Sequence, residues 1–297
     1  MINVLIIGGG CIGFEYSKIC RSLGLDHTLI SRSIIDNNKA EGSPVLNCDV
    51  FNLDNDEIKV FSHIILAVQP RYTFKILSYL LDKTNARILV EKPICLYTSE
   101  FEKISKEVFN LRIFVALNRR FFESTISAKE KIKNEEVIFL EVCFTELIDR
   151  IRGNEEEIKN WGMCNTIHLF DMAFHLCGFP ENLKIKSYGS NGINSYNVTG
   201  NLENGYLSMQ AHWGGPGNWG LTITTNKKKL FFDPLETLRV QENGSFEKTN
   251  IDPNEHNEFK SGFYKQTEKF FDDDKEVFIT YDEYNKLIRI IESIFTK

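Results

Sequence analysis

The chain has 297 residues, of which 42% are hydrophobic and 26% are charged, with a formal net charge of −6 at pH 7. This composition predicts a soluble chain with a sizeable core, folded as one large domain or two ordinary ones. The negative charge argues against a nucleic-acid partner and against an anionic membrane surface. No apolar run approaches the length of a membrane span, and no leader is expected before the first strand. The seven cysteines are scattered without a C-x-x-C pair, which predicts reduced thiols in a cytoplasmic protein and no metal site.

The first predicted element is a short apolar strand over residues 1–7, which runs into a glycine-rich turn. A helix is predicted to follow over residues 14–23. The G-x-G-x-x-G spacing assigns one task to each glycine: Gly8 permits the tight turn, Gly10 lets the backbone approach a pyrophosphate, and Gly13 lets the helix pack closely. The amides at the start of the helix are expected to face the phosphates of a dinucleotide. The cofactor-binding residues predicted in this turn are Gly8, Gly10, Cys11, Ile12 and Gly13.

The second strand, predicted over residues 27–30, ends in Ser31-Arg32-Ser33 rather than in a carboxylate. An acidic residue at this place would bond the ribose hydroxyls of NAD. Arg32 can instead pair with a 2′-phosphate, with Ser31 as a hydroxyl donor, so the sequence favours NADP. Asp36 lies close enough to keep NAD open as the alternative.

The strand–helix alternation then continues to about residue 118 and predicts a Rossmann-like, doubly wound parallel sheet in an N-terminal α/β domain. Further strands are predicted over 45–48, 61–68, 87–90 and 112–117, with helices over 73–81 and 99–109.

From residue 119 the rhythm changes, because successive strands lack intervening helices. The predicted strands cover 136–145, 183–190, 194–202, 206–212, 221–225 and 229–232, and helices over 259–271 and 281–295 close the chain. We therefore expect a dinucleotide-binding domain over 1–118 and an α+β domain with a largely antiparallel open sheet over 119–297.

At this point several motifs together resemble the glucose–fructose oxidoreductase, inositol dehydrogenase and MocA-like family of NAD(P)-dependent oxidoreductases. The resemblance covers essentially the whole chain, and its most specific element is Glu91-Lys92-Pro93. The motifs are the glycine turn, Ala67-Val68-Gln69-Pro70, Glu91-Lys92-Pro93, Asn118-Arg119-Arg120-Phe121, His168-Leu169-Phe170-Asp171 and Gly178-Phe179-Pro180.

The resemblance implies that Lys92 lies beside the nicotinamide and the reacting carbon, where its ammonium can stabilise the developing charge on the substrate oxygen. It also implies that Gln69, Pro70 and Glu91 contribute to the cofactor site. Pro93 commonly follows a cis peptide bond in this family.

The predicted histidine helix departs from the family pattern. Cys164, His168, Asp171 and His175 recur at spacings that place them on one face of an α-helix. Two alignments compete. Spacing alone allows Asp171 and His175 to be the family's Asp–His pair. The distance of Asp171 from Gly178 favours the other alignment, which makes His168 the general acid–base residue and leaves Cys164 where the family has an aspartate.

The predicted substrate-binding residues are Lys92, Arg119, Trp161, Cys164 and His168. One of Arg119 and Arg120 is expected to be structural. The function expected is hydride transfer between nicotinamide and a secondary alcohol or ketone of a sugar-like or polyol-like substrate, by an enzyme that forms a homodimer or homotetramer through its C-terminal sheet. The alternatives are an enzyme resembling biliverdin or imine reductases and a dinucleotide-binding sensor or partner protein with little catalysis.

Overall fold

The computed structural model describes residues 2–33, 40, 42–146, 153–190, 193–251 and 258–295. The chain divides into two compact units, Met1–Asn118 with His256–Asn285 and Arg119–Glu255 with Lys286–Lys297. The boundary after Asn118 coincides with the one expected from the sequence, but a C-terminal segment returns to the first unit. Helix α10 (Phe263–Phe271) brings it there by packing on α1 (Cys11–Ser22), with the rings of Tyr16 and Phe263 5.2 Å apart.

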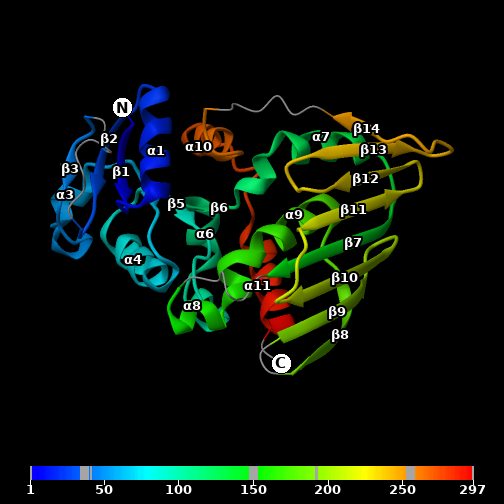
Figure 1. The fold of residues 1–297 in the computed structure, drawn as a ribbon. Helices are drawn as coiled ribbons and strands as arrows, with labels where there is room; N and C mark the ends of the chain where they lie inside the picture. The colour runs from blue at the N-terminus through cyan, green and yellow to red at the C-terminus, as the bar shows by residue number, and fades with distance from the viewer. Residues whose placement is uncertain are drawn as a thin grey trace. The chain divides into compact units, whose positions relative to one another are not determined.

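The first unit contains a six-stranded, wholly parallel sheet of strand order β3-β2-β1-β4-β5-β6 (Figure 1). Its strands are β1 (Asn3–Ile7), β2 (Asp26–Ile30), β3 (Val45–Leu46), β4 (His63–Leu66), β5 (Arg87–Glu91) and β6 (Ile113–Ala116). The predicted doubly wound sheet is confirmed. The order of connection reverses between β1 and β4, and such a point in an open parallel sheet leaves a crevice at the carboxyl ends of its strands.

The helices of the first unit alternate with these strands. Besides α1 and α10 they are η1 (Val50–Asn52), α3 (Asn55–Lys59), α4 (Pro70–Lys83), α5 (Thr98–Phe101) and α6 (Lys106–Arg112). The single helix predicted over 99–109 is wrong. Ser105 interrupts it, because its side chain accepts a hydrogen bond from the backbone N–H of Val108 and so caps the start of a second helix.

The second unit is built on an eight-stranded sheet of order β14-β13-β12-β11-β7-β10-β9-β8. Its neighbours pair antiparallel except for β7 and β10, which run parallel, so the predicted largely antiparallel sheet is confirmed. The strands are β7 (Val137–Glu146), β8 (Glu181–Ser190), β9 (Ile193–Asn201), β10 (Tyr206–Trp213), β11 (Gly220–Thr225), β12 (Lys228–Phe232), β13 (Leu238–Glu242) and β14 (Thr249–Ile251). The last two were not expected, and β14 is too short to carry an alternating apolar pattern.

Helices α7 (Glu123–Ile132) and α9 (Ile167–Cys177) pack on this second sheet, against β13 and β7 respectively. The other helices of the unit are η2 (Asn118–Phe121), α8 (Glu155–Lys159), η4 (Gly162–Thr166) and the end of α11 (Tyr281–Phe295). Alternate residues of β7 form the core, and the ring of Phe144 contacts Phe170 of α9 at 5.8 Å and Phe295 of α11 at 6.4 Å. In the part of the chain that the structure describes, no helix combines the length and apolarity needed to cross a membrane.

Candidate functional site

The glycine turn after β1 has the backbone geometry that its spacing predicts. Gly8 has φ +131°, and a Cβ added to it would lie 2.0 Å from the carbonyl oxygen of Ala67, so only glycine fits where the turn meets the end of β4. A Cβ on Gly13 would lie 1.8 Å from the carbonyl oxygen of Gly8, because α1 packs directly on the turn. Around Gly10, by contrast, an added Cβ would meet no atom of the described residues within 4 Å. The first turn of α1 is therefore open to a ligand.

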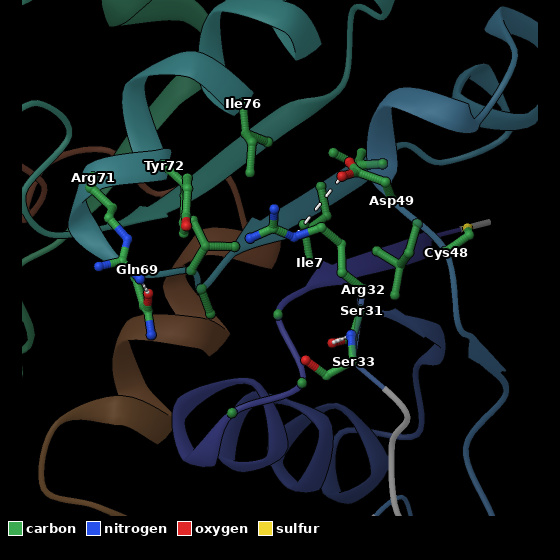
Figure 2. Close-up of a pocket in the computed structure, with 17 residues that line it drawn as sticks. Ile7, Ser31, Arg32, Ser33, Cys48, Asp49, Gln69, Arg71, Tyr72 and Ile76 are labelled. Carbon is green, nitrogen blue, oxygen red and sulfur yellow. Dashed lines mark hydrogen bonds and ion pairs between the residues drawn. The ribbon is translucent and has the colours of Figure 1, made fainter.

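A cavity of about 380 Å³ lies beside this turn, at the carboxyl ends of β1, β2 and β4 (Figure 2). Of the predicted cofactor residues it brings together Gly8, Gly10, Ser31, Arg32 and Gln69. The remaining ones, which are Cys11, Ile12, Gly13, Pro70, Glu91 and Lys92, do not line this cavity. Asp36 lies outside the described residues.

The polar side chains of Asp49, Arg71 and Tyr72 also line the cavity. The guanidinium of Arg32 lies over the ring of Tyr72 at 4.6 Å, and its Nε lies 3.9 Å from a carboxylate oxygen of Asp49. Hydrogen bonds from Arg32 and then Arg71 lower the pKa of the Tyr72 hydroxyl. The available signal was position, since Arg71 and Tyr72 directly follow Gln69 and Pro70 at the start of α4.

The carboxylate of Glu91 is engaged within the first unit. The hydroxyl of Tyr16 donates to its Oε1 at 2.7 Å, and the side-chain amide of Gln266 donates to that hydroxyl at 3.0 Å. Burial raises the pKa of Glu91, and the Tyr16 hydrogen bond opposes this shift. Glu91 therefore fixes α1 and α10 to the end of β5, next to Lys92. The Lys92–Pro93 bond is cis, as the resemblance predicts.

In the second unit, the residues before α9 do not continue its α-helix. Residues Gly162–Thr166 form a π-helix, and α9 begins at Ile167. The expectation that Cys164 shares one α-helical face with His168, Asp171 and His175 is therefore wrong, because the i→i+5 turn shifts the phase between Cys164 and His168. Both of these side chains are buried, with 7% and 9% of their surface exposed.

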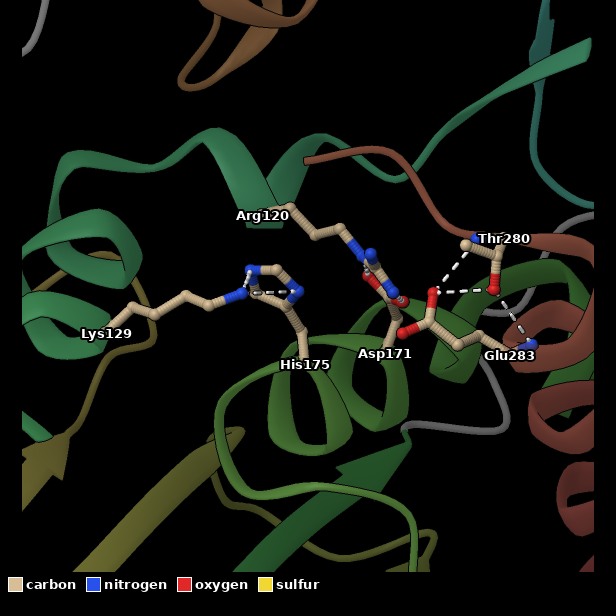
Figure 3. Close-up of polar contacts among 6 residues, drawn as sticks. All are labelled: Arg120, Lys129, Asp171, His175, Thr280 and Glu283. Carbon is tan, nitrogen blue, oxygen red and sulfur yellow. Dashed lines mark hydrogen bonds and ion pairs between the residues drawn. The ribbon is translucent and has the colours of Figure 1, made fainter. Parts of the chain in front are cut away.

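Two polar contacts engage Asp171 and His175 of α9 (Figure 3). Arg120 forms a buried bidentate ion pair with Asp171, in which Nη2 donates to Oδ1 at 2.8 Å and Nε donates to Oδ2 at 3.0 Å. Lys129 donates to Nε2 of His175 at 3.0 Å. Burial, with the nearby Arg120 and Lys129 charges, lowers the pKa of His175 to about 2. Asp171 is therefore engaged by Arg120 and His175 by Lys129, and the alignment that makes these two residues the catalytic pair stays a prediction.

The other predicted substrate residues lie in the same unit. The guanidinium of Arg119 stacks over Trp219 at 5.2 Å, and burial lowers its pKa. Trp161 lies close to Glu146 at the end of β7. Burial raises the pKa of Glu146, and the nearby indole of Trp161 and the hydrogen bonds from Asn165 and Thr166 partly offset this shift.

The predicted residues are thus divided between the units. The glycine turn, Ser31, Arg32, Gln69, Pro70, Glu91 and Lys92 belong to the first, and Arg119, Trp161, Cys164 and His168 to the second. Within the described ranges, no three His, Cys, Asp or Glu side chains are grouped as metal ligands would be.

No family model and no curated protein matches this chain. Solved structures do. The chain is similar to a dehydrogenase (MviM) from Clostridium difficile, at 19% identity over 99% of both chains and a TM-score of 0.77.

It is also similar to UDP-N-acetylglucosamine 3-dehydrogenase GnnA from Acidithiobacillus ferrooxidans, at 14% identity over 99% of this chain and 97% of that one, with a TM-score of 0.76. A candidate NADPH-dependent oxidoreductase from Desulfitobacterium hafniense matches at 16% identity over 99% of this chain and 94% of that one, with a TM-score of 0.76. The chain therefore has the fold of the glucose–fructose oxidoreductase, inositol dehydrogenase and MocA-like dehydrogenases.

Proposed function

We propose that this chain is an NAD(P)-dependent oxidoreductase that acts on a secondary alcohol or ketone of a sugar-like or polyol-like substrate, with NADP as the preferred cofactor. The observation that carries the proposal is the open glycine turn beside the cavity at the switch point of the parallel sheet. The fold of the chain is similar to those of dehydrogenases, one of which is named as acting on a nucleotide sugar. This similarity supports the proposed reaction and substrate class.

In this proposal the glycine turn takes the pyrophosphate. The amides at the start of α1 face it, and nothing stands over Gly10 to prevent its approach. The bound nicotinamide would supply the hydride chemistry. The hydrogen bond from Tyr16 to Glu91 holds the residue directly before the lysine.

Two side chains would act on the substrate oxygen. The Lys92 ammonium would hydrogen-bond it and stabilise its developing negative charge. His168 would donate a proton to the carbonyl during reduction or accept the hydroxyl proton during oxidation.

A second candidate is a dinucleotide-binding sensor or partner protein with little catalysis. The observation that favours it is Cys164, which stands in a π-helix where the family pattern has an aspartate. A buried thiol does not supply the anionic partner that this aspartate would give to the acid–base histidine.

Measurement of turnover distinguishes the oxidoreductase from the dinucleotide-binding sensor. We expect the purified chain to bind NADPH and to oxidise it with a member of a panel of keto-sugars. Lys92→Ala should keep NADPH binding and lower turnover by about two decades or more, as loss of a preorganised charge donor does. Lys75→Ala removes an exposed positive charge elsewhere in the first unit and serves as the control.

Comparable turnover in Lys92→Ala and the native chain would show that Lys92 is not catalytic. Tight NADPH binding without turnover of any alcohol or ketone, in either direction, would favour the sensor.

A further inference from the structure

Two guanidinium groups meet on one tyrosine ring in the cavity of the first unit. The carbon at the centre of the Arg32 guanidinium lies 4.6 Å from the centroid of Tyr72, and that of Arg71 lies 4.9 Å from the same centroid. Figure 2 shows the Tyr72 ring between the two arginine side chains. The arginines come from different strand ends, since Arg32 follows β2 and Arg71 follows β4. The parallel sheet therefore brings the two cations to one place.

Each arginine is held by more than the ring. Arg71 donates from Nη2 to the side-chain oxygen of Gln69 at 2.5 Å, which fixes its guanidinium at the cavity wall. Arg32 approaches Asp49 at 3.9 Å, the outer limit of an ion pair, and both side chains are partly exposed at 59% and 31%. An ion pair that is long and partly exposed is weak, so an anionic ligand can displace it at little cost.

The charges of the cavity lining leave an excess of positive charge. Among the described residues that line it, Arg32, Arg71 and Asp49 are charged, which gives 2 − 1 = +1. Like charges on one ring repel each other, and an anion bound between them relieves that repulsion while gaining charge-assisted hydrogen bonds.

The two cations match a phosphomonoester better than a phosphodiester. A phosphomonoester carries a charge of about −1.5 to −2 near neutral pH and offers three acceptor oxygens. Each phosphate in the pyrophosphate bridge of a dinucleotide is esterified on both sides and carries a single negative charge. Ser31 and Ser33 add hydroxyl groups to the same lining. Each guanidinium can supply a pair of parallel N–H donors to such a group.

We propose that Arg71 and Tyr72 complete, together with Arg32, a two-guanidinium receptor for the 2′-phosphate of the adenosine ribose. Arg71 is the second residue that binds this phosphate, and both guanidinium groups are positioned by stacking on the ring of Tyr72. This inference rests on the proposed NADP preference and names the residues that produce it.

The test uses two fragments that lack nicotinamide, so it needs no substrate. Adenosine 2′,5′-bisphosphate carries the additional phosphate, and 5′-AMP does not. Calorimetric titration of the native chain should give tighter binding of the bisphosphate. Arg71→Ala should weaken bisphosphate binding about tenfold to a hundredfold, the range expected for charge-assisted bonds to one group, and leave 5′-AMP binding nearly unchanged.

Variants of Tyr72 and a matched charge control complete the experiment. Tyr72→Phe keeps the ring and should retain most of the bisphosphate preference, whereas Tyr72→Ala should lose it. Lys75→Ala removes one exposed positive charge from the same helix, outside the cavity lining, and should change both affinities little. Circular dichroism of each variant checks that the fold is retained.

The outcomes distinguish this inference from the proposed function. If the native chain binds both fragments equally, the NADP preference is itself wrong. If Arg32→Ala abolishes the preference while Arg71→Ala keeps it, the preference stands and the two-guanidinium receptor is refuted. Equal weakening of both fragments by Arg71→Ala would also refute it, because Arg71 would then shape the nucleotide site without contacting the 2′-phosphate.

Discussion

At the scale of single residues, the cofactor choice depends on what stands at the end of β2. Arg32 occupies the place where a carboxylate would accept hydrogen bonds from both ribose hydroxyls. The carboxylate that the structure does bring close is Asp49, which follows β3 and pairs only loosely with Arg32. Asp49 is thus the residue through which an unphosphorylated ribose could still be recognised.

Replacing Arg32 tests this preference directly. Arg32→Ala should weaken NADPH binding by about tenfold or more and NADH binding far less, because only the 2′-phosphate loses a charge-assisted partner. Fluorescence titration of the two reduced cofactors provides the measurement. Equal losses for both cofactors, or a native preference for NADH, would contradict the interpretation.

At the scale of secondary-structure elements, the ion pair between Arg120 and Asp171 joins η2 to α9. Both side chains are almost fully buried, at 2% and 1% exposure, and the contact is bidentate. It fixes the helix that carries His168 relative to the segment that carries Arg119. Of the two neighbouring arginines, Arg120 is therefore the structural one.

Removing one partner of this pair should be costly. Asp171→Asn should lower the free energy of unfolding by about 3–5 kcal/mol, because it takes away the anion that compensates a buried guanidinium. Glu141→Gln, which breaks the partly exposed pair with Lys229 in the same unit, should cost no more than about 1 kcal/mol.

The double variant Arg120→Met with Asp171→Leu should recover most of the stability. Urea unfolding followed by tryptophan fluorescence is suited to all three variants, since Trp161, Trp213 and Trp219 all lie in the second unit. A loss for Asp171→Asn no larger than that for Glu141→Gln would show that the ion pair contributes little.

At the scale of the whole molecule, the response of stability to acid combines groups of opposite sign from both units. Burial lowers the pKa of His27, His63 and His175, so each is protonated in the unfolded chain before it is protonated in the folded one. These histidines destabilise the fold as pH falls below 6.5. The raised pKa values of Glu91 and Glu146 act in the opposite direction, because the folded state binds their protons first.

His175 gives the clearest single contribution to this balance. Its pKa is about 2 in the folded chain and 6.5 in the unfolded one, so its destabilising effect grows throughout the interval from pH 6.5 down to about pH 2. Between pH 7.5 and 5.5 the native chain should lose about 1.4 kcal/mol more stability than His175→Gln. Unfolding curves at the two pH values measure this difference. Parallel losses in the two proteins would mean that His175 has an ordinary pKa.

The sequence by itself determined the fold class and the backbone geometry of the glycine turn. Gly8, Gly10 and Gly13 belong to one local motif, so their spacing could be interpreted before the close approach of Gly8 to Ala67 at the end of β4 was known. The same holds for buried parallel strands, whose continuous apolar runs mark them in the sequence. Arg32 could be assigned because its position after the second strand is fixed by the motif.

Tertiary structure decided the features that join distant segments. It places the guanidinium groups of Arg71 and Arg32 over the same Tyr72 ring. It also links Glu91 to Tyr16, and Tyr16 to Gln266, by hydrogen bonds, and makes α10 part of the first unit. It also replaced an expected α-turn by a π-helix ahead of His168. Helical spacing predicts which residues share a face only while the i→i+4 hydrogen-bond pattern persists. A contact between residues 250 positions apart, such as that of Tyr16 with Gln266, has no local signature in the sequence, because it depends on how whole elements pack.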